Sequence, residues 1–108
     1  MARAKFQTLT EQMFYILLCL RTECCGTDVM EQVRQLTRDR VTVGPGTLYS
    51  LLDSFLHAGM IRETKVEGRK RSYLITEAGH KALEEEYRRL QILTADYESC
   101  TNERRRLE

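Results

Sequence analysis

The chain has 108 residues, of which 42% are hydrophobic and 31% charged, and its formal net charge is +1. This length predicts one domain, and no apolar run approaches the roughly 18 residues of a membrane span, which argues against a membrane protein. The start also lacks the apolar core of a secretory signal, so we expect a cytoplasmic protein, and the near-neutral total leaves the distribution of charge to indicate the partner.

Residues 10–22 predict a first helix, which Thr10 can cap. Its apolar residues, Met13 and Leu17 among them, cover nearly the whole circumference. A helix that is apolar all round is buried on more than one side. In so small a chain, this pattern suggests that a second subunit covers part of the helix.

The segment Cys24-Cys25-Gly26 breaks the first helix, and helical spacing resumes over residues 27–38. Thr27 or Asp28 can cap this second helix. Residues 40–43 then form a short extended stretch rich in β-branched side chains.

The third predicted helix begins in the segment Gly44-Pro45-Gly46, which contains the only proline of the chain, and runs to about Ala58. Gly44 suits the N-cap and Pro45 the first helical position. Gly59 follows the helix as a C′ glycine.

The apolar period changes over residues 60–76, where two extended arms flank the turn Glu67-Gly68-Arg69. Within residues 62–71, five basic residues stand against two acidic ones, a local charge of +3 in a molecule of total charge +1. The basic residues are Arg62, Lys65, Arg69, Lys70 and Arg71. This concentration predicts a basic hairpin tip that suits nucleic acid, with a solvated charged surface as the alternative.

Thr76 can cap a last long helix, in which Gly79 is a mild flaw because glycine weakens helices. Apolar residues at spacings of three and four give this helix a seam of near-heptad character. We expect Glu84, Glu85 and Glu86 to form an acidic face that avoids DNA. From the first and last helices together, we predict a dimer interface containing Met13, Leu17, Leu83, Tyr87, Leu90 and Tyr97.

The predicted fold is mainly α with a small two-stranded β wing. A winged helix-turn-helix over residues 1–76 is followed by a long dimerisation helix over residues 77–108, and the two parts form one compact unit. In this arrangement the third helix enters the major groove of DNA and the hairpin lies over backbone or minor groove. The candidate DNA-binding residues are Gly46, Thr47, Tyr49, Ser50, Lys65, Arg69, Lys70 and Arg71.

Three segments together resemble the PadR family of bacterial transcriptional regulators: LTEQMFYILLCL, GPGTLYSLLDSFLHAGMI and GRKRSYLITEAGHKAL. The resemblance covers most of residues 8–90. It implies a homodimeric repressor that binds a palindromic DNA operator and is released by a small aromatic or drug-like effector. The chain departs from the family at Ser50, where proline is common, and over residues 53–57, where a basic-acidic stretch is common.

Other functions find less support in the sequence. There is no G-x-S-x-G motif and no carboxylate pair of evident purpose, so we expect no enzyme activity. No C-x-x-C pair exists, and we predict neither a metal site nor a cofactor. Two alternatives stay open: a winged-helix module that binds protein, and a thiol or metal sensor that uses Cys24, Cys25 or Cys100.

Overall fold

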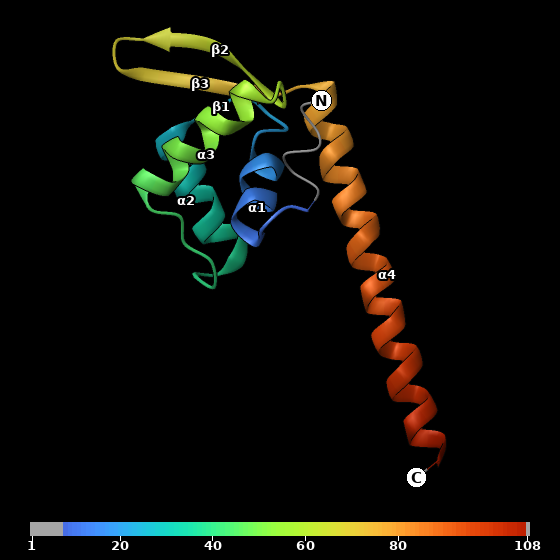
Figure 1. The fold of residues 1–108 in the computed structure, drawn as a ribbon. Coiled ribbons are helices and arrows are strands. Elements are labelled where there is room, and N and C mark those ends of the chain that lie inside the picture. The colour runs from blue at the N-terminus through green and yellow to red at the C-terminus, as the bar shows by residue number, and fades with distance from the viewer. Residues whose placement is uncertain (1–7, 108) are drawn as a thin grey trace.

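The computed structural model describes residues 8–107, with side chains described through Asn102. Its elements are α1 (Glu11–Cys19), β1 (Cys24–Cys25), α2 (Gly26–Thr37), α3 (Pro45–His57), β2 (Ile61–Glu67), β3 (Lys70–Ile75) and α4 (Glu77–Leu107). The helices α1, α2 and α3 form a cluster, with the hairpin of β2 and β3 over one end of it (Figure 1). α4 runs along another side of the cluster and projects well beyond it (Figure 1).

The sheet has three strands in the order β1-β3-β2, so the prediction of a two-stranded wing was wrong in this detail. β1 pairs antiparallel with β3, placing Cys24 opposite Tyr73 and Cys25 opposite Ser72. The stretch at residues 40–43, predicted to be extended, forms no strand. The chain leaving α1 lies instead along β3, where it gives partners to backbone groups that the hairpin alone would leave unpaired.

The start of α2 also differs from its prediction, because the residue just before the helix belongs to strand β1. Cys25 belongs to the strand and is also the N-cap of α2, without a side-chain hydrogen bond. The helix therefore begins at Gly26, and neither Thr27 nor Asp28 caps it. The segment Cys24-Cys25-Gly26 thus contains strand β1 and the first residue of α2.

Packing within one chain explains why α1 is apolar all round. Thr10 caps the helix as predicted, with the Met13 N–H donating to its Oγ1 at 3.2 Å, and the helix ends at Cys19, earlier than expected. α1 contacts both α2 and α4, and Met13 and Leu17 are 6% and 0% exposed. Their burial therefore requires no second subunit.

The third helix follows its prediction closely. Gly44 is the N-cap, Pro45 lies in the first turn, and Gly59 has a φ of +73° just beyond the end. The buried side of α3 joins the core, whose largest fully buried side chains are Phe55, Ile16, Leu17, Leu20, Leu48, Leu52, Val29 and Val33. The opposite side of α3 is left facing solvent, because α1 and α2 lie on the inner side only.

Thr76 joins the sheet to α4. Its Oγ1 accepts a hydrogen bond from the Gly79 N–H at 3.2 Å, which confirms the predicted cap. The same hydroxyl donates to the Gly59 carbonyl at 2.6 Å, and the Thr76 N–H donates to the Met60 carbonyl at 2.9 Å. These bonds hold the first turn of α4 against the end of α3 and the start of β2.

Glu86 does not belong to an acidic surface, contrary to the prediction. It is 4% exposed, accepts a hydrogen bond from the Leu9 N–H at 3.0 Å and forms an ion pair with Arg89. The hydrogen bonds from Arg89 lower the pKa of the Glu86 carboxyl, assisted by the Leu9 N–H, and outweigh the opposite effect of burial. This carboxylate ties the segment before α1 to α4.

We expect Glu86→Gln to lower the free energy of unfolding by about 1–2 kcal/mol at pH 7, because the ion pair with Arg89 is lost and the Leu9 N–H then donates to a neutral group. The folded pKa of Glu86 lies below its unfolded value. Its contribution is therefore complete above an ordinary glutamate pKa of about 4.3 and is lost as pH falls through the folded pKa. The stabilities of wild type and variant, measured by denaturant titration, should converge as pH falls through the folded pKa of this carboxyl.

The control is Glu84→Gln, which removes an exposed carboxylate that pairs with Arg88 at 3.5 Å. It should change stability by less than about 0.5 kcal/mol. Equal effects of the two substitutions at pH 7 would show that the buried carboxylate has no special role.

Candidate nucleic-acid interface

The first turn of α3 presents free backbone N–H groups and small side chains to solvent. Gly44 provides no side-chain cap, and Gly46 and Thr47 are both exposed. A Cβ at Gly46 would meet no atom within 4 Å, so the protein itself does not require glycine here. The amino end of a helix with uncapped N–H groups and no bulk is suited to approach a phosphate.

Tyr49 lies across the start of α2. A Cβ added to Gly26 would stand 2.8 Å from the Tyr49 Oη and 2.9 Å from its Cε1, so a side chain at residue 26 would displace the ring from its present position. Tyr49 is nevertheless 47% exposed. The hydroxyl is therefore held near the amino end of α2 while still facing solvent on one side.

A concavity of about 420 Å³ lies between α2, α3 and the wing. Its lining residues are Cys25, Gly26, Thr27, Tyr49, Arg69, Lys70, Arg71 and Tyr73. The structure thus brings Tyr49 together with three basic residues of the wing, Arg69, Lys70 and Arg71. The sequence pattern missed Gly26 and Thr27, because only the packing of Tyr49 against α2 places them at this groove.

The wing cations differ in what they contact. Arg71 donates to Glu63 across the hairpin at 3.0 Å, and Lys65 lies 3.6 Å from Glu67. In the part of the chain that the structure describes, Arg69 and Lys70 have no ion-pair partner, and both are exposed. Arg62 at the base of β2 is likewise exposed and without an ion pair among the described residues, so the tip carries two of the three unpaired wing cations, and Lys65 is outside the groove lining.

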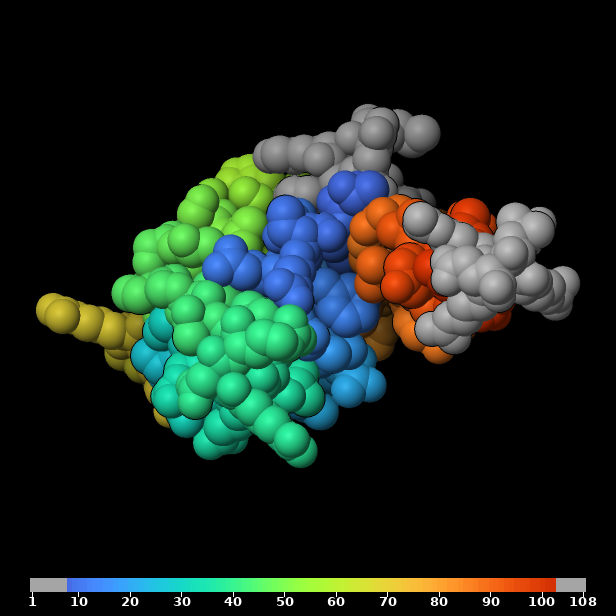
Figure 2. Space-filling model, turned by 90° about the horizontal axis from the view of Figure 1, so that it is seen from below, coloured from blue at the N-terminus to red at the C-terminus, as the bar shows by residue number. Residues whose placement is uncertain are grey.

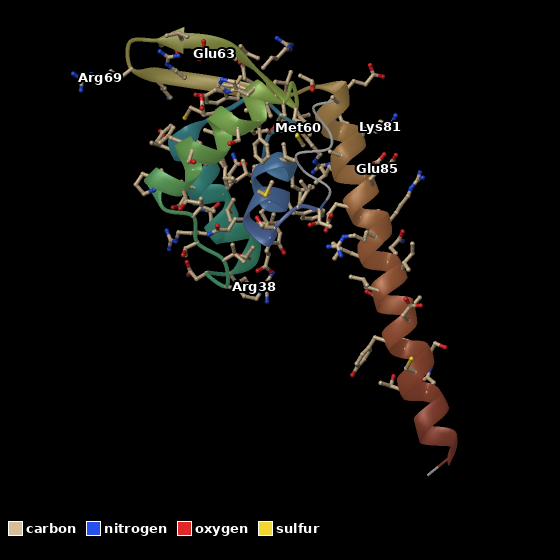
Figure 3. The ribbon with its side chains drawn as sticks, viewed as in Figure 1. Arg38, Met60, Glu63, Arg69, Lys81 and Glu85 are labelled. Atoms are coloured by element: carbon tan, nitrogen blue, oxygen red, sulfur yellow. The ribbon has the colours of Figure 1, made fainter. Side chains whose placement is uncertain are left out.

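The wing tip and the start of α3 lie on the same side of the molecule, away from α4 (Figures 1 and 2). Figure 3 shows Arg69 at the tip of the hairpin, directed away from the helices, whereas Lys81 lies on α4 at the opposite side. Ser50 is exposed on the outer side of α3. Among the predicted DNA-binding residues, those of α3 and the wing tip thus share one side, with α4 behind them.

The predicted dimer residues separate into two groups. Met13, Leu17 and Leu83 are no more than 7% exposed within a single chain, so they offer almost no surface to a partner. The other three are exposed: Tyr87 at 54%, Leu90 at 39% and Tyr97 at 70%. A concavity of about 790 Å³ lies between α1 and α4 beside these residues, with Phe14, Leu18, Leu83 and Tyr87 in its lining.

The cysteines give no support to a sensor at Cys24. Cys24 and Cys25 are buried, Cys19 is half-buried and Cys100 is exposed. Burial raises the pKa of the Cys24 thiol to about 11, so the reactive thiolate is scarce at neutral pH. Over the residues that the structure describes, no group of three or more His, Cys, Asp or Glu side chains could hold a metal ion.

Solved structures share this fold. A transcriptional regulator from Clostridium thermocellum has a TM-score of 0.69 and 19% identity, covering 82% of this chain and 86% of its own. A PadR family transcriptional regulator from Eggerthella lenta has a TM-score of 0.72 and 17% identity, covering 82% and 80%. A putative transcriptional regulator from Thermoplasma acidophilum has a TM-score of 0.62 and 22% identity, covering 84% and 89%.

No curated protein matches the chain. Among the described residues, no helix combines the length and apolar character needed to cross a membrane. The sequence profile of the PadR-like transcriptional regulators, in contrast, matches residues 16–85, which include all of α2, α3 and the wing. The chain belongs to the PadR-like family of transcriptional regulators.

Proposed function

We propose that the protein is a homodimeric, sequence-specific DNA-binding regulator in which α3 enters the major groove and the wing tip contacts the backbone or the adjacent minor groove. The observation that supports this most is the groove shared by Tyr49 and the wing, with Arg69 and Lys70 free of acidic partners beside it. The hydroxyl groups of Thr47 and Ser50 are available for phosphates and base edges.

A homodimer would contain two copies of the DNA-binding surface formed by α3 and the wing. Tyr87, Leu90, Leu93 and Tyr97 repeat at helical spacing along α4 and are between 39% and 70% exposed, and a long helix with an uncovered apolar seam favours a partner helix. Two α3 helices would then read two half-sites about 34 Å apart, or a multiple of that distance, so the operator should be palindromic.

The regulator would act as a repressor released by a small aromatic or drug-like effector. The concavity between α1 and α4 has the volume of a small-molecule site, and its lining combines aromatic and aliphatic side chains such as Phe14 and Leu18 with charged ones such as Arg21 and Glu84. It borders the exposed residues of α4 that we assign to the dimer. A ligand there would change how the two subunits pack and thereby the distance between their α3 helices.

The proposal is tested by the salt dependence of binding to a palindrome from the protein's own promoter region. Wild-type affinity should fall steeply with salt, because Lys and Arg contacts release counterions from DNA. The double variant Arg69→Ala and Lys70→Ala should weaken binding to all sequences alike. The slope of log K against log salt should also decrease by about 2, roughly one unit for each lost phosphate contact.

A matched control replaces Lys81 and Arg88 on α4 with alanine, which removes the same charge from the opposite side of the molecule. Its salt slope should equal that of wild type. If the wing variant kept the wild-type slope, the wing would have no contact with DNA. The absence of binding to any duplex, or wild-type binding that does not respond to salt, would instead favour a protein-binding module.

A further inference from the structure

The outer side of α3 carries one formally charged residue. Gly46, Ser50, Asp53 and His57 lie opposite the buried stripe of the helix, and all four are exposed. The side chains of Asp53 and His57 are 72% and 73% exposed. Asp53 is the only Asp, Glu, Lys or Arg between Pro45 and His57.

The Asp53 carboxylate is available to an outside donor. In the described part of the chain its one titratable neighbour within 4 Å is His57, whose Nδ1 lies 3.6 Å from Asp53 Oδ2 and 2.9 Å from the Asp53 carbonyl oxygen. The imidazole therefore hydrogen-bonds with the backbone rather than with the carboxylate. Both carboxylate oxygens remain free to accept hydrogen bonds.

A carboxylate in the major groove is tolerated only beside a donor. Phosphates border the groove, and guanine N7 and O6 and thymine O4 are acceptors that repel it. Cytosine presents its N4 amino group as a donor, whereas adenine places the N7 acceptor beside its N6 amino group. Among the four bases, cytosine is thus the one whose groove edge suits a carboxylate best.

We propose that Asp53 is a specificity-determining residue that accepts a hydrogen bond from cytosine N4 at one position of each half-site. This inference rests on the proposed function, since it requires α3 to lie in the major groove. The helix rises about 1.5 Å per residue, so Asp53 lies about 4.5 Å further along the axis than Ser50. It therefore meets a base pair one or two steps beyond the one that Ser50 faces.

The test is selection from a randomised duplex library with wild type and with Asp53→Asn. Asparagine has nearly the same shape but both donates and accepts, and it pairs with the N6 and N7 of adenine. Wild type should enrich cytosine at one position of each half-site, and the variant should enrich adenine there. Measured on single duplexes, each protein should prefer its own base about tenfold, with the other positions unchanged.

The control is Asp96→Asn, which removes the same charge from an exposed position on α4, outside the proposed DNA interface. It should keep the wild-type base preferences. If Asp53→Asn instead bound every sequence more tightly with unchanged preferences, Asp53 would be only a repulsive charge and the inference would be overturned, while the proposed function would stand. If wild type enriched no sequence at all, the proposed function itself would fail.

Discussion

Replacing Gly79 with alanine is expected to lower the free energy of unfolding by about 2–4 kcal/mol, although alanine is the better helix former by about 1 kcal/mol. A Cβ at this buried position would stand 2.1 Å from the Met60 carbonyl oxygen and 2.6 Å from Ile75 Cγ1. Backbone cannot yield as a flexible side chain can, so the first turn of α4 must move. That movement would break the hydrogen bond from the Thr76 N–H to the Met60 carbonyl.

The same change at Gly46 is the control for Gly79→Ala. Gly46 also lies near the start of a helix, but a Cβ there would meet no atom within 4 Å. Gly46→Ala should therefore leave stability unchanged or raise it by up to about 1 kcal/mol. Thermal unfolding of both variants checks the pair, and similar melting temperatures would contradict the close packing of α4 on the sheet.

The second large effect concerns the dimer. The double variant Tyr87→Glu and Tyr97→Glu should weaken self-association at least 100-fold, because it places like charges in the exposed seam of α4 and removes two aromatic contacts. Both tyrosines are more than half exposed in the single chain. The fold of each subunit should therefore survive, which circular dichroism can verify while sedimentation measures association.

Ile92→Glu is the matched control for the dimer variant. Ile92 is 61% exposed, but the helical period places it roughly on the other side of α4 from Tyr97. The control should sediment as wild type does. A Tyr87 and Tyr97 variant that still formed a wild-type dimer would remove α4 from the proposed interface, and the palindromic operator would lose its structural basis.

Local patterns predicted much of this fold because their causes lie within a few residues. The caps at Thr10 and Thr76 each depend on an N–H group three residues away. The start of α3 at Gly44 and Pro45 depends on fixed backbone angles, and the turn at Gly68 on a φ of +62°. Such features can be predicted from sequence, since neighbours along the chain are certain to be neighbours in space.

The candidate site could be predicted only in part. The apolar residues of α3 recur at helical spacing and so mark the side that is buried. The exposure of Thr47 and Ser50, which lie away from that side, follows from this pattern. Which wing cations remain free depends on the register of the hairpin, in which Arg71 reaches Glu63 while Arg69 lies in the turn. The number of basic residues in the sequence does not show which of them will pair with an acidic residue in the fold.

The sequence by itself determined the order of helices and hairpin, the caps of α1, α3 and α4 and the basic wing, because periodicity and capping are properties of adjacent residues. The tertiary structure alone decided that β1 pairs with β3 and that Gly26 makes room for Tyr49. It also decided that Glu86 is buried against the Leu9 N–H, 77 residues away in the chain. Contacts of this kind depend on which distant segments meet, and no local pattern of residue types contains that information.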